Sequence, residues 1–162
     1  PEELMDKVIY LPCDISEHTV EAYEDEDAIH NINEPVMRSC FMTNMSFDDE
    51  DIIVSIDADE IIYREAWPYI ISEVKTKELV RLNLYQFFYK FTYLWEGKDF
   101  TSPIASKYKV FKYQYPCNWR DVGQVLSKKV GCHFSWCMTP EEMVYKLHTV
   151  TQDIGFVQTK NF

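Results

Sequence analysis

The chain has 162 residues, of which 46% are apolar and 15% aromatic, so it can bury a core and form one domain spanning residues 1–162. Its formal net charge of −11 argues against nucleic acid as a partner and disfavours an anionic membrane surface, because both are bound by basic faces. No apolar run approaches the roughly 20 residues of a membrane-spanning helix, so membrane attachment would need a segment outside this sequence.

The first half of the chain alternates between strand and helix patterns. We predict a strand over residues 7–11, then an acidic solvated loop, then a helix over residues 33–45. A short apolar run predicts a buried strand over residues 51–56. Apolar side chains at helical spacing, with a proline near the start, predict a second helix over residues 64–78.

The second half of the chain is richer in strand patterns. Residues 79–95 are dominated by aromatic and aliphatic side chains and predict a long strand or a hairpin. Aromatic residues on alternate positions share one face: Tyr85, Phe87, Tyr89 and Phe91. We expect that face to pack into the core, with a platform for stacking against a sugar ring as the alternative.

Two further segments complete the predicted fold. Residues 106–120 are locally basic and are expected to form solvated strand positions, with neutralisation of a phosphate as the alternative. Residues 131–150 predict a strand or loop that runs into a helix, which begins with a capping box formed by Thr139, Pro140 and Glu142. Together the elements predict an α/β fold in which helices flank a mixed sheet.

Three carboxylates directly follow the apolar run 51–56, namely Asp57, Asp59 and Glu60. In extended backbone Asp57 and Asp59 point to the same face, and neighbouring carboxylates repel each other unless a positive charge lies between them. Mn²⁺ and Mg²⁺ favour carboxylate oxygens and bridge them to substrate phosphates. The stretch therefore predicts a divalent cation site, with a solvated turn as the simpler alternative.

A cation held in this way suits the transfer of a sugar from a nucleotide diphosphate. The cation stabilises the negative charge that grows on the departing diphosphate. The transition state resembles an oxocarbenium ion, and attack with inversion also needs a base for the acceptor hydroxyl. Open α/β sheets bind ligands beyond the carboxyl ends of their strands, and these carboxylates are expected at such an end.

Several segments together resemble glycosyltransferase family 17, the family of the N-acetylglucosaminyltransferase that adds the bisecting residue to N-glycans. Residues 51–65 resemble the family's strand followed by D-A-D-E-I and an arginine, and residues 83–90 resemble the aromatic strand after it. The most specific match is residues 131–147, which are similar to the family's G-W-H-x-S-W-C-x-T-P-E block. The segments occur in the family's order over nearly the whole chain.

The resemblance implies a GT-A-like mixed sheet flanked by helices. The family's first, nucleotide-binding strand has no counterpart before Lys7, so we expect a partial or minimal domain. The implied donor is a nucleotide sugar, UDP-N-acetylglucosamine in the named member, and the implied acceptor is a glycan or glycoprotein, such as the β-linked mannose of N-glycans. Eukaryotic members are Golgi membrane proteins, so the expected location is the lumenal side of the Golgi membrane, or otherwise the cytoplasm.

The resemblance also implies roles for individual residues. Asp57 and Asp59 are expected to bind Mn²⁺ or Mg²⁺, with His133 as a third ligand. Candidates for substrate contact are Arg64, Ser135 and Trp136, where a surface ion pair is the alternative for Arg64 and a core position the alternative for Trp136. Candidates for the catalytic base are Glu60, Glu141 and Asp153.

Two other functions fit the same residues. A nucleotidyltransferase or phosphohydrolase would use the same carboxylates for a metal without needing a sugar acceptor. A non-catalytic carbohydrate-binding or nucleotide-binding domain would keep the fold, and its ligand binding would depend little on metal.

Overall fold

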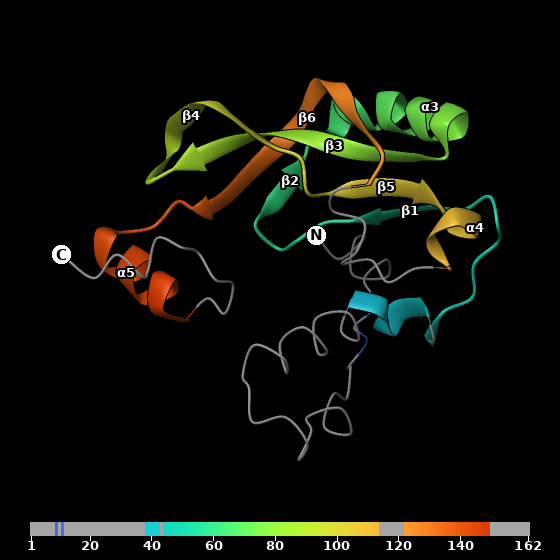
Figure 1. The fold of residues 1–162 in the computed structure, drawn as a ribbon, viewed down its shortest axis with the longest axis horizontal. Coiled ribbons are helices and arrows are strands. Elements are labelled where there is room, and N and C mark those ends of the chain that lie inside the picture. The colour runs from blue at the N-terminus through green and yellow to red at the C-terminus, as the bar shows by residue number, and fades with distance from the viewer. Residues whose placement is uncertain (1–8, 10, 12–37, 43, 114–121, 150–162) are drawn as a thin grey trace, which may run out of the picture.

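The computed structural model describes residues 9, 11, 38–42, 44–113 and 122–149 (Figure 1). Within them, six strands form one sheet. The strands are β1 (Ile52–Ser55), β2 (Glu60–Ile62), β3 (Leu79–Phe88), β4 (Lys90–Phe100), β5 (Ile104–Lys107) and β6 (Gln124–Trp136). The helices are the 3₁₀-helix η1 (Arg64–Ala66) and the α-helices α3 (Trp67–Lys77), α4 (Tyr108–Phe111) and α5 (Pro140–Thr149), and residues 38–42 and 44 are also helical.

The sheet is mixed and curled. Its strand order is β1-β5-β3-β6-β2, with β3 and β6 parallel and the other pairs antiparallel. β5 pairs with the first part of β3, and β4 pairs with its last part. Figure 1 shows α3 beside the sheet and α5 beyond the end of β6. The predicted class, a mixed sheet flanked by helices, is confirmed.

The main core lies between α3 and the sheet. α3 presents Ile70 and Val74, which are one helical turn apart and fully buried in one cluster with Val80 and Leu84 of β3. Burying each of these side chains contributes about 1.5–3 kcal/mol. The helix predicted over residues 64–78 is therefore confirmed, except that its first turn is the 3₁₀-helix η1.

A short helix replaces part of the strand predicted over residues 106–120. β5 is followed at once by α4, whose Phe111 is fully buried in a second apolar cluster with Leu79 and Ile104. Burial of Phe111 explains the helical turn, because a solvated strand would leave this ring in water. The lysines of the segment pair with acidic side chains, Lys107 with Glu50, Lys109 with Glu78 and Lys112 with Asp49.

The aromatic segment forms a hairpin of β3 and β4, which turns at Tyr89 with a positive φ of 68°. The expectation that its alternating aromatic face packs into the core is wrong for three of its four rings, while the fourth, Phe87, is half-buried and stacks on Phe134. Tyr85 is 38% exposed, Tyr89 40% and Phe91 69%. The reason is that α3 covers the opposite face of β3, where Leu84 is buried.

Some predicted elements lie outside the described residues. They are most of the strand over 7–11, of which only residues 9 and 11 are described and neither is assigned to a strand, the acidic loop after it, the beginning of the helix over 33–45, and Asp153. Among the helices that the structure describes, none is both long enough and apolar enough to cross a membrane.

Candidate metal centre

The three carboxylates after β1 lie on a tight turn. The backbone N–H of Glu60 donates to the carbonyl of Asp57 at 3.1 Å, and the backbone N–H of Asp57 donates to Glu60 Oε2 at 2.7 Å. The prediction that extended backbone places Asp57 and Asp59 on one face is therefore wrong. The turn directs the two aspartates to different partners, because the alternation of a strand does not apply within it.

The turn leads into β2, which β6 holds in place. Glu60 pairs with His133 in the antiparallel register, and the N–H of Phe134 donates to the carbonyl of Asp59 at 2.9 Å. The close approach of the strands requires Gly131, since a Cβ there would lie 2.1 Å from the carbonyl oxygen of Ile61. β6 thus brings the histidine from late in the chain to the carboxylates.

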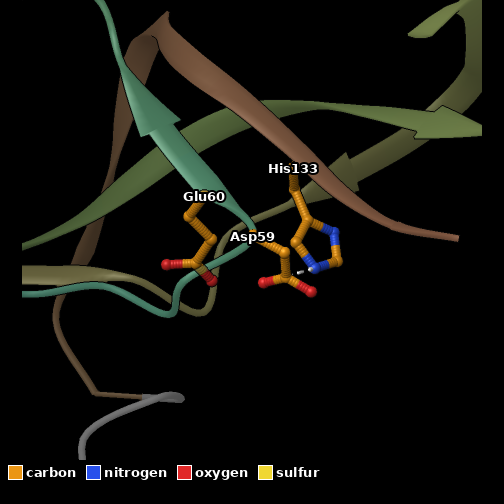
Figure 2. A group of neighbouring side chains, drawn as sticks. All are labelled: Asp59, Glu60 and His133. Carbon is orange, nitrogen blue, oxygen red and sulfur yellow. Dashed lines mark ion pairs between the residues drawn. The ribbon is translucent and has the colours of Figure 1, made fainter. Parts of the chain in front are cut away.

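The resulting cluster consists of Asp59, Glu60 and His133, shown in Figure 2. One ligand atom from each lies within 4.8 Å of the others, and His133 Nε2 is 3.9 Å from Asp59 Oδ1. Glu60 and His133 are each 6% exposed, whereas the Asp59 side chain is 40% exposed. The cluster is therefore buried on the sheet side and open to solvent at Asp59.

The imidazole of His133 is held by its neighbours on the sheet. Its ring stacks on Phe100 of β4, with centroids 3.6 Å apart and planes 10° from parallel. In the parallel register Gln86 of β3 is the partner of His133, so Glu60, His133 and Gln86 form a row across β2, β6 and β3. Gln86 is 4% exposed, and its Oε1 accepts no hydrogen bond from any residue that the structure describes.

Asp57 belongs to a neighbouring pair and not to this cluster. Its carboxylate receives two hydrogen bonds from Arg38, Nη1 to Oδ1 at 2.6 Å and Nη2 to Oδ2 at 3.3 Å. A pocket of about 10 Å³ lies between the two groups, lined by Arg38, Asp57 and Glu60 together with Ser55, Ser102, Pro103 and Ile104. This volume is the size of one water molecule or one small ion.

The remaining predicted residues lie away from the cluster. Ser135 and Trp136 end β6, where Lys146 of α5 donates to the carbonyl of Ser135 at 2.7 Å and lies 5.1 Å from the centre of the Trp136 ring. Arg64 is exposed in η1 and makes no ion pair with a described residue. Glu141 is exposed in the first turn of α5.

One titratable pair joins Tyr63, which follows β2, to Cys132 of β6. The hydroxyl of Tyr63 is 2.8 Å from the Sγ of the buried Cys132. Desolvation, followed by this hydrogen bond, raises the pKa of Tyr63 to about 12. The phenol therefore stays neutral at physiological pH.

The cluster fits a divalent cation. Two ligands that are each about 2.1 Å from a shared ion are at most about 4.2 Å apart. The 3.9 Å between His133 Nε2 and Asp59 Oδ1 satisfies that limit for this pair, while the three ligand atoms together lie within the wider limit of 4.8 Å. Two carboxylates suit a hard cation, and an imidazole suits a transition metal. Mn²⁺ meets both requirements.

The sequence pointed to Asp59 and His133 as ligands, to Glu60 only as a candidate base and to Asp57 as a ligand, and three neighbours of the cluster were missed. Arg38, Gln86 and Phe100 reach the site through contacts between distant segments. The one signal available was Gln86, a polar residue between the aromatic residues Tyr85 and Phe87.

Comparisons with protein-family models, with characterised proteins and with solved structures found no match. The resemblance to glycosyltransferase family 17 therefore stays a prediction, and the functional argument rests on the residues themselves.

Proposed function

We propose that the protein is a metal-dependent glycosyltransferase of GT-A type. In this proposal Asp59, Glu60 and His133 hold Mn²⁺, and through it the diphosphate of a nucleotide sugar such as UDP-N-acetylglucosamine. The observation that carries the proposal is the convergence of two carboxylates and an imidazole within 4.8 Å at the end of a sheet strand. The simpler alternative, a turn whose carboxylates only face solvent, does not require a buried histidine from a distant strand beside them.

The burial of each cluster residue indicates the role that it has in this proposal. Glu60 is buried and bonded to the Asp57 N–H, so it suits a fixed ligand better than a base that must meet an acceptor hydroxyl. Asp59 is the exposed member, so in this proposal it faces the arriving substrate. The cation supplies Lewis-acid stabilisation of the leaving diphosphate. The base stays open between the other two candidates, Glu141, which lies on α5 away from the cluster, and Asp153, which is outside the described residues.

The aromatic hairpin supports a carbohydrate acceptor. Tyr89 and Tyr93 lie near each other on the hairpin, and the ammonium of Lys90 is 5.4 Å from the centre of each ring. Tyr89 is 40% exposed and Tyr93 52% exposed. Exposed rings next to a hydrogen-bond donor suit a sugar, whose faces are apolar and whose edge carries hydroxyls.

Calorimetric titration of UDP and UDP-N-acetylglucosamine, with and without Mn²⁺, tests the proposal. We expect binding that requires Mn²⁺ and that Asp59→Asn weakens by roughly tenfold or more. Asp48→Asn is the matched control, because Asp48 is an exposed carboxylate on the turn before β1. Binding that ignores both the metal and Asp59→Asn would contradict the metal bridge. Release of inorganic phosphate from the nucleotide, with no transfer to a glycan, would favour a phosphohydrolase.

A further inference from the structure

The ion pair between Arg38 and Asp57 stands next to the cation cluster. Asp57, Asp59 and Glu60 place three carboxylates within four residues, and such a group repels itself unless positive charge is near. Arg38 supplies one positive charge through a two-pronged contact with Asp57. The guanidinium of Arg38 therefore neutralises part of the negative charge of this turn, as a bound divalent cation would.

Asp57 is also coupled to the cluster directly. Its backbone N–H donates to Glu60 Oε2 at 2.7 Å, so a change at either residue moves the other. Both residues line the pocket of about 10 Å³ that Arg38 also lines. A cation at Glu60 and a guanidinium at Asp57 are consequently close enough to repel each other.

We propose that Arg38 is a built-in counter-ion that competes with the divalent cation for the carboxylates of this turn. Asp57 holds the guanidinium of Arg38 beside the cluster, and repulsion between that guanidinium and a cation at Glu60 makes the affinity for the cation lower than Asp59, Glu60 and His133 alone would give. The inference rests on the proposed cation site and adds an element that sets its strength. It assigns Arg38 a role as a positioning residue that acts through Asp57.

The ion pair between Arg38 and Asp57 is partly open to water. The side chains are 23% and 33% exposed, and water weakens an ion pair that it reaches, so a nearby cation can perturb this one. Arg38 also borders a hollow of about 440 Å³ that residues of β1 line.

The test is the affinity for Mn²⁺ alone, measured by calorimetry on the whole chain. Arg38→Met removes the charge and keeps most of the aliphatic stem, and we expect it to bind Mn²⁺ roughly threefold to tenfold more tightly than the natural chain. Arg38→Gln, the second variant in case Arg38→Met does not fold, should show the same gain. Arg38→Lys keeps the charge and should stay within about twofold of the natural affinity.

Two controls separate competition from other effects. Lys77→Gln removes a unit charge from the exposed end of α3, where Lys77 pairs with Glu73, and should leave the affinity unchanged. The gain from Arg38→Met should disappear when Asp57→Asn is also present, because the competition acts through that carboxylate.

The outcomes distinguish this inference from the proposed function. Equal or weaker Mn²⁺ binding by a folded Arg38→Met variant, with normal binding by the natural chain, overturns the inference and leaves the cation site intact. Absence of Mn²⁺ binding in both chains overturns both proposals. Binding by the variant alone supports the inference in its strongest form.

Discussion

Asp57 and Asp59 are separated by one residue, yet they meet different partners. The turn that begins at Asp57 sends its carboxylate to Arg38, whereas Asp59 lies 3.9 Å from His133. The cause is local, since Glu60 accepts the Asp57 N–H and closes the turn. Two chemically identical side chains thus differ in accessible charge, with Asp57 already neutralised and Asp59 open to a cation.

Tyr63 gives a prediction about alkaline pH. Desolvation and the bond to Cys132 raise its pKa to about 12 from an ordinary value of 10. A raised pKa stabilises the fold fully below the unfolded value, and that stabilisation is lost as the pH rises from about 10 towards 12. We therefore expect the free energy of unfolding to fall less in Tyr63→Phe than in the natural chain when the pH rises from about 9 to about 11.

Urea unfolding at the two pH values measures this difference. Tyr113→Phe is the control, because Tyr113 is 78% exposed. An alkaline loss of stability that is the same in Tyr63→Phe and in the natural chain would show that Tyr63 does not titrate in the predicted range.

At the scale of elements, the site depends on how closely β2 approaches β6. β2 has only three residues, so its own propensity is too weak to form it, and it exists through its pairing with β6. The register of that pair places Glu60 opposite His133. Any change that separates the two strands should therefore weaken the cation cluster as well as the fold.

Gly131→Ala is the change that tests this dependence. The new Cβ would lie 2.1 Å from the carbonyl oxygen of Ile61, so the strands must separate. We expect a loss of about 1–3 kcal/mol in the free energy of unfolding, together with weaker Mn²⁺ binding. Denaturant unfolding and calorimetry measure the two effects.

Gly97→Ala is the matched control, because Gly97 has a φ of 74° and no atom within 4 Å of the added Cβ. It should cost stability through backbone strain and leave Mn²⁺ binding unchanged. If Gly131→Ala keeps the natural Mn²⁺ affinity, the pairing of β2 with β6 is not what assembles the site.

Elements with strong local signals could be predicted from the sequence. The strand over 51–56, the helix over 64–78 and the hairpin within 79–95 follow from periodicity. The capping box before α5 forms as expected, with the Glu142 N–H 3.3 Å from Thr139 Oγ1 and the Thr139 N–H 2.8 Å from Glu142 Oε2. Each of these features depends on residues that are close in the chain.

The features that could not be predicted depend on distant contacts. β2 forms by pairing with β6, and α4 forms where Phe111 is buried. The ion pair of Asp57 is made with Arg38, which lies in a separate helical segment. Alternation of side chains does not reveal which face of a strand α3 covers, so the exposure of the aromatic face could not be predicted.

At the scale of the whole molecule, the acidic charge and the sheet topology both favour a cation site in this account. A chain with a net charge of −11 attracts cations and repels anions such as a sugar nucleotide. In the proposed function, a divalent cation at the end of the sheet would reverse the sign of the charge locally and make a diphosphate site on an acidic protein. The cluster is therefore the point on which the functional account depends.

Pulsed electron paramagnetic resonance of Mn²⁺ bound to the protein tests that cluster most directly. The account predicts that one equivalent of Mn²⁺ shows coupling to a histidine nitrogen, and that the coupling is lost in His133→Gln while the fold is retained. Mn²⁺ that shows no nitrogen coupling, or a coupling that survives in His133→Gln, would contradict the assignment of Asp59, Glu60 and His133 as the metal centre.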